Sequence, residues 1–231
     1  MNFTVVGDAS VEATIRTAGG TTTDDDGDVL VAVGEDALRA AALDVESDTP
    51  LVPVACDAPW SVARNDLQGV IEAIVADELA PVEHPVLSVR VGDEHVGRAL
   101  FDVMLVTSEP AHISAYSVAD ARAVTSSNDG WHSLDTFRAD GVVAATPLGS
   151  SGYARAAGGT IVGPGAGLAV VPVSPYATQT DSWVLQPPLR LRVEREESPV
   201  SLVLDADIAA EVAPYEPVVV EFDQSVSLLL D

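Results

Sequence analysis

The sequence has no lysine, a single cysteine, few aromatic residues and no long apolar run. Its eleven basic residues are all arginines, and they face 36 acidic residues, so the formal net charge is −25. Nucleic-acid binding needs clustered basic side chains, and the arginines here are few and scattered, which excludes nucleic acid as an expected partner. The lone Cys56 excludes an internal disulfide, and we expect it to be a small buried side chain.

Membrane segments and metal-ligand patterns are missing as well. No apolar stretch reaches the roughly 18 residues of a membrane-spanning helix, and residues 1–4 lack the basic character that opens a signal peptide. We therefore expect a soluble, cytoplasmic protein without a membrane partner. The four histidines do not have the spacing of metal ligands, so we expect no metal site built from the chain's own side chains.

Acidic residues are abundant and dispersed along the chain. Their mutual repulsion should destabilise the compact state in dilute buffer. Salt at about 1 M shortens the screening length to roughly 3 Å and removes most of that cost. We therefore predict a halophilic protein from a salt-rich cytoplasm. Hydrophobic residues still make up 47% of the 231 residues, which is enough for a substantial folded core.

The first part of the chain alternates between short apolar runs and amphipathic segments. Strands are expected at residues 3–6, 21–23, 28–33 and 51–55, and helices at residues 10–18, 35–43 and 62–79. The nearly continuous apolar character of residues 28–33 is typical of a strand buried on both faces of a parallel sheet. The alternation predicts an α/β open-sheet domain over residues 1–81.

The pattern changes in residues 82–231, where apolar and polar residues alternate. Only residues 153–157 have a helical pattern. Turn-forming residues separate the apolar runs, and strands are expected at residues 86–91, 98–106, 111–118, 141–145, 168–173, 189–193, 200–204 and 217–222. This part of the chain should therefore be a mainly antiparallel β domain.

Residues 137–159 carry a specific motif. They read Phe-Arg-Ala-Asp-Gly-Val-Val-Ala-Ala-Thr-Pro-Leu-Gly-Ser-Ser-Gly-Tyr-Ala-Arg-Ala-Ala-Gly-Gly. This resembles the signature of the NAD kinase family, in which an Asp-Gly pair and a strand precede Thr-Pro-x-Gly-Ser-Thr-Ala-Tyr and a Gly-Gly pair. The chain is identified as a diverged member of that family, of haloarchaeal type. The resemblance implies a two-domain NAD kinase-like fold with its site in the cleft between the domains.

The chemistry of the motif suits a bound nucleotide. Backbone N–H groups of a glycine-rich turn can hold phosphate oxygens, and the resemblance gives this role to Gly149 and Ser150. Tyr153 offers an aromatic face on which a purine can stack. The resemblance adds further substrate-binding residues: Asp102, Arg138, Asp140, Thr146, Ser151 and Gly152. The alternatives are that the turn is an ordinary structural loop and that Tyr153 packs in the core.

Residues 28–36 sit where the family has a strand ending in Gly-Gly-Asp-Gly. The resemblance implies that Gly34 binds phosphate and that Asp36 is the catalytic carboxylate. Asp36 would accept the proton of the 2′-hydroxyl of the adenosine ribose of NAD as phosphate arrives from ATP or polyphosphate, giving NADP. Such transfer also needs Mg²⁺ or another divalent metal to spread charge. The alternative for Asp36 is a helix N-cap. By the same resemblance we expect a homodimer or homotetramer.

Departures from the family's pattern leave two functions open. From residue 34 the loop reads Gly-Glu-Asp-Ala-Leu, so two glycines are replaced and Glu35 adds negative charge near the phosphates. Phe101 replaces a side-chain amide of the family. The alternative to a NAD kinase is therefore a non-catalytic homologue that binds a nucleotide for regulation or as a partner subunit. A relative of the diacylglycerol and sphingosine kinases is disfavoured by the motif at residues 137–159.

Overall fold

The chain forms two compact units. In this computed structural model, residues 1–230 are described except for residues 45–48, 110–113, 122–129 and 196–197. One unit comprises Met1–Pro85 and Ser225–Asp231, and the other comprises Val86–Gln224. The boundary between residues 81 and 82 stays a prediction, whereas the compact units change at Pro85 and again at Gln224, where the last strand returns the chain to the first unit.

The first unit is a parallel sheet with helices. Its strands lie in the order β2-β1-β3-β4, and β4 also pairs in parallel with the end of the last strand, β16, through Leu51 and Leu228. The strands are β1 (Asn2–Val6), β2 (Thr21–Thr23), β3 (Val29–Val33), β4 (Leu51–Val54) and β16 (Pro217–Leu228). The helices are η1 (Ala9–Val11), α1 (Glu12–Thr17), α2 (Glu35–Leu43) and α3 (Leu67–Val75).

Both faces of this sheet are buried, as strand β3 illustrates. Val31 packs with Ile15 of α1 and Ile71 of α3 in one apolar cluster. Side chains alternate along a strand, so the neighbouring Ala32 faces the other side, where α2 lies against β3 and β4 and buries Leu38. The predicted α/β open sheet is confirmed.

The second unit consists of β-strands with one short helix. Its first sheet has the antiparallel order β12-β11-β10-β7-β14-β15, and the other strands are paired in the order β6-β5-β16-β13-β8-β9. The first sheet contains β7 (Asp102–Thr107), β10 (Gly141–Ala145), β11 (Leu168–Val173), β12 (Trp183–Leu185), β14 (Val200–Leu204) and β15 (Asp207–Val212). The others are β5 (Val82–Val91), β6 (Glu94–Ala99), β8 (Ser114–Asp120), β9 (His132–Ala139) and β13 (Leu189–Arg195).

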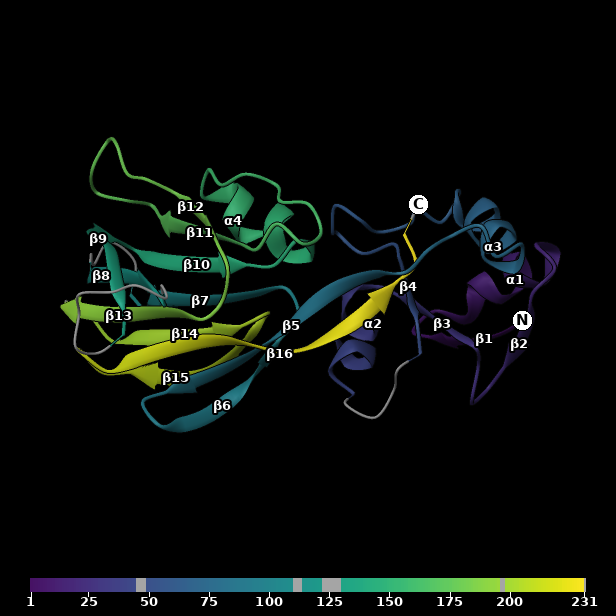
Figure 1. The fold of residues 1–231 in the computed structure, drawn as a ribbon, viewed down its shortest axis with the longest axis horizontal. Coiled ribbons are helices and arrows are strands. Elements are labelled where there is room, and N and C mark those ends of the chain that lie inside the picture. Colours follow the sequence, from purple (N-terminus) through teal and green to yellow (C-terminus); the bar gives the residue numbers. More distant parts are fainter. Residues whose placement is uncertain (45–48, 110–113, 122–129, 196–197, 231) are drawn as a thin grey trace. The chain divides into compact units, whose positions relative to one another are not determined.

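The core of this unit lies between its two groups of strands. One cluster joins residues of the first sheet, such as Leu105, to residues of the second group, such as Tyr116 and Leu191. A smaller cluster on the opposite face of the first sheet contains Val143 and Ala154, the latter from helix α4 (Tyr153–Ala156). Figure 1 shows α4 beside β10 and β11. The predicted mainly antiparallel β domain is confirmed.

The helix expected at residues 62–79 is shorter than predicted. At its start, Val62 forms an isolated bridge with Val54, so this part of the apolar pattern belongs to a sheet contact. At its end, Asp77 adopts a left-handed φ of 58°, which an α-helix cannot continue through. Leu79 still packs against the core of the first unit, which explains why its spacing looked helical.

The expected strand at residues 98–106 is instead two strands, β6 and β7, interrupted at Leu100 and Phe101. Strands β9, β12 and β15 were not predicted; β12 and β15 bury few of their side chains, so the sequence carries little alternation there. Strand β5 begins before the predicted residue 86, and β16 continues past residue 222. Residues 111–113 of an expected strand lie outside the described residues.

Candidate functional site

The motif at residues 137–159 folds as a strand, a buried turn and a short helix. Every residue of β10 is buried, so packing of this strand fixes the position at which the turn begins. The turn that follows contains the 3₁₀ helix η2 (Leu148–Ser151) and leads directly into α4. Thr146 and Ser150 are completely buried. The turn is therefore part of the packed interior rather than a loop on the surface.

Thr146 anchors this turn to the segment between β6 and β7. Its hydroxyl donates a hydrogen bond to the carbonyl oxygen of Leu100 at 2.7 Å. Its backbone N–H donates to the carbonyl oxygen of Phe101 at 2.8 Å. The Thr146 hydroxyl also accepts from the N–H of Gly149 at 3.3 Å. Thr146 was predicted to bind substrate, but these three hydrogen bonds all join it to other residues of the protein.

Gly149 and Ser150 complete the attachment. A Cβ atom on Gly149 would lie 2.1 Å from the carbonyl oxygen of Phe101, so only glycine allows this approach. The Ser150 hydroxyl donates to the carbonyl of Pro147 at 2.8 Å and accepts from the N–H of Val162 at 3.2 Å. Both residues therefore hold the turn in place. The Cβ position of Gly149 and the hydroxyl of Ser150 each point at other residues of the protein and not at solvent.

The residues after the buried turn are the ones that reach solvent. Ser151 is partly exposed and Gly152 is exposed. Tyr153 is 59% exposed, so the core-packing alternative for Tyr153 is wrong. An exposed tyrosine ring next to a rigid glycine-rich turn is a suitable surface for stacking a purine.

The two predicted acidic substrate-binding residues lie near the ends of buried strands. Asp102 begins β7 and is 4% exposed, and its N–H donates to Asp205 Oδ1 at 3.1 Å. The carbonyl of Asp140 accepts from the Thr107 hydroxyl at 2.7 Å and from the Tyr116 hydroxyl at 3.2 Å. Burial raises the pKa of Tyr116 to about 12, so its phenol stays a hydrogen-bond donor to Asp140 throughout the physiological range.

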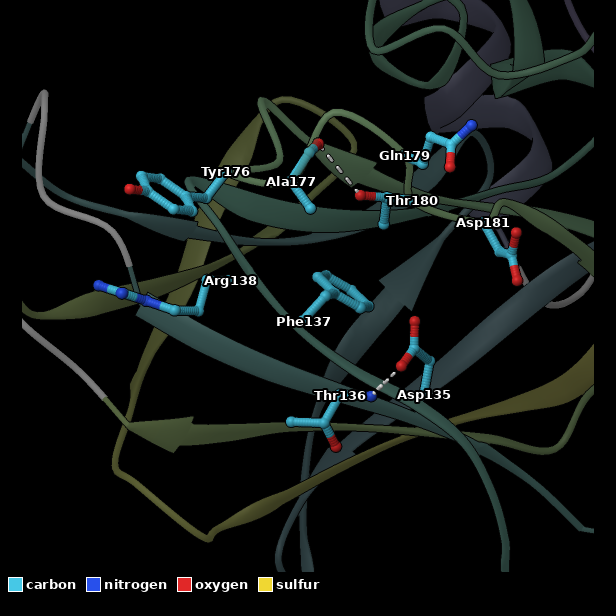
Figure 2. A pocket seen from close by; sticks show the side chains of 9 residues that line it. All are labelled: Asp135, Thr136, Phe137, Arg138, Tyr176, Ala177, Gln179, Thr180 and Asp181. Carbon is cyan, nitrogen blue, oxygen red and sulfur yellow. Dashed lines mark hydrogen bonds between the residues drawn. The ribbon is translucent and has the colours of Figure 1, made fainter.

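Arg138 lines a pocket of about 380 Å³ in the second unit. The pocket lies between β9 and the segment that joins β11 to β12. The guanidinium group of Arg138 is 5.4 Å from the ring centroid of Tyr176, a cation–π distance. Figure 2 shows Arg138 and Tyr176 at one end of the pocket, Asp181 near the other, and Phe137 between them. The pocket thus offers a positive aromatic end and an acidic end to a ligand.

The predicted catalytic residue, Asp36, and the predicted phosphate-binding Gly34 lie in the first unit, where β3 is followed by α2. Gly34 has a φ of 91° and is the N-cap of α2, which excludes the N-cap alternative for Asp36. The side chain of Asp36 is fully exposed, with Arg39 Nη2 at 3.8 Å. Glu35 Oε1 accepts a hydrogen bond from the N–H of Asp57 at 3.1 Å. This bond links the start of α2 to the loop after β4.

The described residues bear on the expectations for a metal site and for Cys56. They contain no group of three or more His, Cys, Asp or Glu side chains arranged to hold a metal ion. Cys56 is only partly buried, contrary to expectation, and burial raises the pKa of its thiol, which makes it a poor nucleophile. In the part of the chain that the structure describes, no helix is both long and apolar enough to cross a membrane.

The sequence did not indicate the buried residues that hydrogen-bond to the backbone of the predicted site residues. Tyr116 and Thr107 fix the backbone of Asp140, and Asp205 fixes the backbone at residues 100–102. The only available signal was an aspartate directly after the alternating run at residues 200–204, which predicts a turn. It gives no indication of which backbone groups that aspartate would bind.

The fold and the motif together define a class of protein. The family profile described as the ATP-NAD kinase C-terminal domain matches residues 102–226, which is more than half of the chain, and the chain belongs to the NAD kinase family. A NAD kinase of Methanoregula boonei is 30% identical over 141 residues, which cover 60% of this chain and 49% of that protein. A NAD kinase of Methanopyrus kandleri is 27% identical over 176 residues, which cover 74% of this chain and 60% of that protein.

Solved structures show the same fold. Yeast NADH kinase in complex with NADH superimposes with a TM-score of 0.75 at 14% identity, covering 100% of this chain and 83% of that one. A NAD kinase from Archaeoglobus fulgidus in complex with ATP gives 0.70 at 18% identity, covering 99% and 93%. The chain nevertheless spans only about half to three fifths of the length of the two curated relatives named above.

Proposed function

We propose that the chain is a NAD kinase that phosphorylates the 2′-hydroxyl of the adenosine ribose of NAD with ATP or polyphosphate. The observation that carries the proposal is the motif at residues 137–159, which places the exposed ring of Tyr153 directly after a turn fixed by buried hydrogen bonds. A rigid turn positions bound groups without an ordering cost at the moment of binding. The names of the relatives, NAD kinase and NADH kinase, point to the same activity.

The proposed roles follow from exposure and charge. Tyr153 and Ser151 contact the dinucleotide, and Arg138 supplies a positive charge to it. Asp36 accepts the proton of the attacking hydroxyl while the bond from that oxygen to the γ-phosphorus of ATP forms and ADP leaves. The fully exposed carboxylate of Asp36 is accessible to such a substrate. Gly149, Ser150 and Thr146 act by holding the turn, since their polar groups bond within the protein.

A divalent metal enters this proposal with the nucleotide. The described residues do not build a metal site of their own. Mg²⁺ commonly keeps several waters and is held by phosphates together with one or two carboxylates. We therefore treat Mg·ATP as the substrate and assign no step to a metal held by the protein.

One observation favours the alternative of a non-catalytic homologue. The carboxylate of Glu35 lies at the start of α2 and accepts a hydrogen bond from Asp57. A helix N-terminus attracts anions, so Glu35 occupies the environment that a nucleotide phosphate would prefer. If this contact excludes phosphate, the chain binds NAD through its second unit and does not transfer phosphate.

The decisive experiment compares NADP formation by the parent chain, Asp36→Asn and Asp44→Asn. The assay contains NAD, ATP and MgCl₂ in about 2 M KCl, a concentration that screens the acidic surface. A parallel assay replaces ATP with polyphosphate. Asp44→Asn removes the same charge at the other end of α2 and controls for a general effect of charge.

A catalytic role for Asp36 predicts turnover in the parent and in Asp44→Asn, with a loss of about 100-fold or more in Asp36→Asn. No turnover in the parent, together with NAD binding in calorimetry, would establish the non-catalytic homologue. Neither turnover nor binding would overturn both.

The wider setting of the proposal is a salt-rich cytoplasm and a homodimer or homotetramer. The dispersed acidic excess supports the first part. The second part rests on the family resemblance and is tested by sedimentation in concentrated KCl, where a monomer at all protein concentrations would contradict it.

A further inference from the structure

The turn between β14 and β15 carries a buried carboxylate that binds three consecutive backbone amides. Asp205 Oδ1 accepts hydrogen bonds from the N–H groups of Phe101 at 2.7 Å and Asp102 at 3.1 Å. Asp205 Oδ2 accepts from the N–H of Leu100 at 3.1 Å. In return, the N–H of Asp205 donates to the carbonyl of Asp102 at 2.9 Å. The residue is 7% exposed and has a left-handed φ of 55°.

Two of these three amides, those of Leu100 and Phe101, lie outside the strands and have the Asp205 carboxylate as their acceptor. Leu100 and Phe101 separate β6 from β7, and Leu100 is completely buried. A buried N–H without an acceptor costs about 1–3 kcal/mol. A carboxylate forms hydrogen bonds about twice as strong as those of a neutral acceptor. Asp205 therefore determines the path of the chain from residue 100 to residue 102.

The same segment presents its carbonyl groups to the motif of the proposed site. The Leu100 carbonyl accepts from the Thr146 hydroxyl, and the Phe101 carbonyl accepts from the Thr146 N–H. Gly149 lies so close to Phe101 that no Cβ fits between them. Any shift of residues 100–102 would therefore displace the turn that leads to Tyr153.

We propose that Asp205 is a positioning residue of the NAD site, which fixes the turn at residues 146–151 through the backbone of residues 100–102 without itself contacting the nucleotide. The inference rests on the proposed function, because it assumes that this turn and Tyr153 bind NAD. It goes beyond that function by assigning the geometry of the turn to a residue of the β14–β15 turn, outside the motif.

The test compares Asp205→Asn with Asp207→Asn in about 2 M KCl. Both variants lose one negative charge within the same hairpin, but Asp207 is exposed. In Asp205→Asn the remaining oxygen still accepts from Phe101 and Asp102, whereas the amide nitrogen cannot accept from Leu100. The measurements are hydrogen exchange of the amides of Leu100, Gly149 and Ser150, and the dissociation constant for NAD, at a temperature where each variant is fully folded.

Positioning predicts that Asp205→Asn accelerates exchange at Leu100 and Gly149 and weakens NAD binding, each by about tenfold. Asp207→Asn should match the parent within about twofold. A role in stability alone would lower the unfolding temperature while exchange at Gly149 and NAD affinity in the folded protein stay unchanged, and this result would overturn the proposal.

Two further arms keep the test decisive. If Asp205→Asn does not fold, Asp205→Glu replaces it, since it keeps the charge and moves the carboxylate by one methylene; unchanged exchange and affinity in that variant would overturn the proposal. If the parent does not bind NAD, the proposed function fails by itself. Exchange at Gly149 and Ser150 then decides whether Asp205 orders the turn: faster exchange supports that role, and unchanged exchange refutes it.

Discussion

Two glycine-containing turns in this protein begin in the same way and are built differently. Gly34 in the first unit and Gly149 in the second each follow a buried strand and lead towards a helix. The turn at Gly149 is buried and joined to residues 100 and 101 by three hydrogen bonds and a close backbone contact. The loop at Gly34 is followed by the exposed Asp36, and a Cβ on Gly34 would meet no atom within 4 Å.

The difference shows which part of the proposed site is fixed by packing. A buried turn with satisfied polar groups has one conformation, because leaving those groups unpaired is costly. An exposed loop has no such restraint and tolerates substitutions. This explains how the motif at residues 137–159 keeps the family pattern while the loop at residues 34–38 departs from it. The predictions below test this contrast.

The largest effect is expected from Gly149→Ala compared with Gly34→Ala. The new Cβ at residue 149 would overlap the Phe101 carbonyl, which Thr146 and Asp205 hold in place, so destabilisation of about 3 kcal/mol or more is expected. At residue 34 the only penalty is the left-handed φ of 91°, which costs about 1–2 kcal/mol. Thermal unfolding in concentrated KCl measures both. Equal losses would contradict the contrast.

The second effect concerns salt. The first unit contains half of the 36 acidic residues but only three of the eleven arginines, although it is the smaller unit. Its self-repulsion should therefore be stronger. Lowering KCl from about 2 M to about 0.1 M should accelerate hydrogen exchange in β1 and β3 before it affects β7 and β10. Sucrose at matched osmolality provides the control, since it does not screen charge. Exchange that is independent of KCl would refute the halophilic prediction.

The third effect concerns the Thr146 hydroxyl. Thr146→Val keeps the shape but leaves the buried Leu100 carbonyl without this donor, which should cost about 1–3 kcal/mol. Thr146→Ser keeps the donor and loses only a methyl group, so its cost should be smaller, about 1 kcal/mol. Urea unfolding of the two variants gives the comparison. If Thr146→Ser were the less stable variant, packing rather than hydrogen bonding would fix the turn.

The sequence predicted much of this architecture but little of its internal support. Buried strands such as β3 and β10 were found because their apolar runs are short and bounded by turn residues. The motif located Thr146, Gly149 and Tyr153. It could not reveal that Thr146 bonds to Leu100, because hydrogen bonds between residues 46 positions apart depend on tertiary packing. For the same reason the break at residues 100 and 101, which Asp205 stabilises, was predicted as continuous strand.

The smallest effect is expected from Glu35→Gln, which tests whether the Glu35 carboxylate lowers the affinity of the loop at residues 34–38 for phosphate. The glutamine oxygen can still accept from the Asp57 N–H, so the unfolding temperature should not change. Removing one negative charge near the start of α2 should raise the affinity for ATP by about two- to fivefold. Calorimetry at the lowest KCl concentration that keeps the protein folded maximises the effect. Glu78→Gln is the matched control, because it removes an exposed charge elsewhere in the same unit. If the ATP affinity of Glu35→Gln equals that of the parent, the Glu35 carboxylate does not compete with phosphate, and the case for a non-catalytic homologue loses its structural basis.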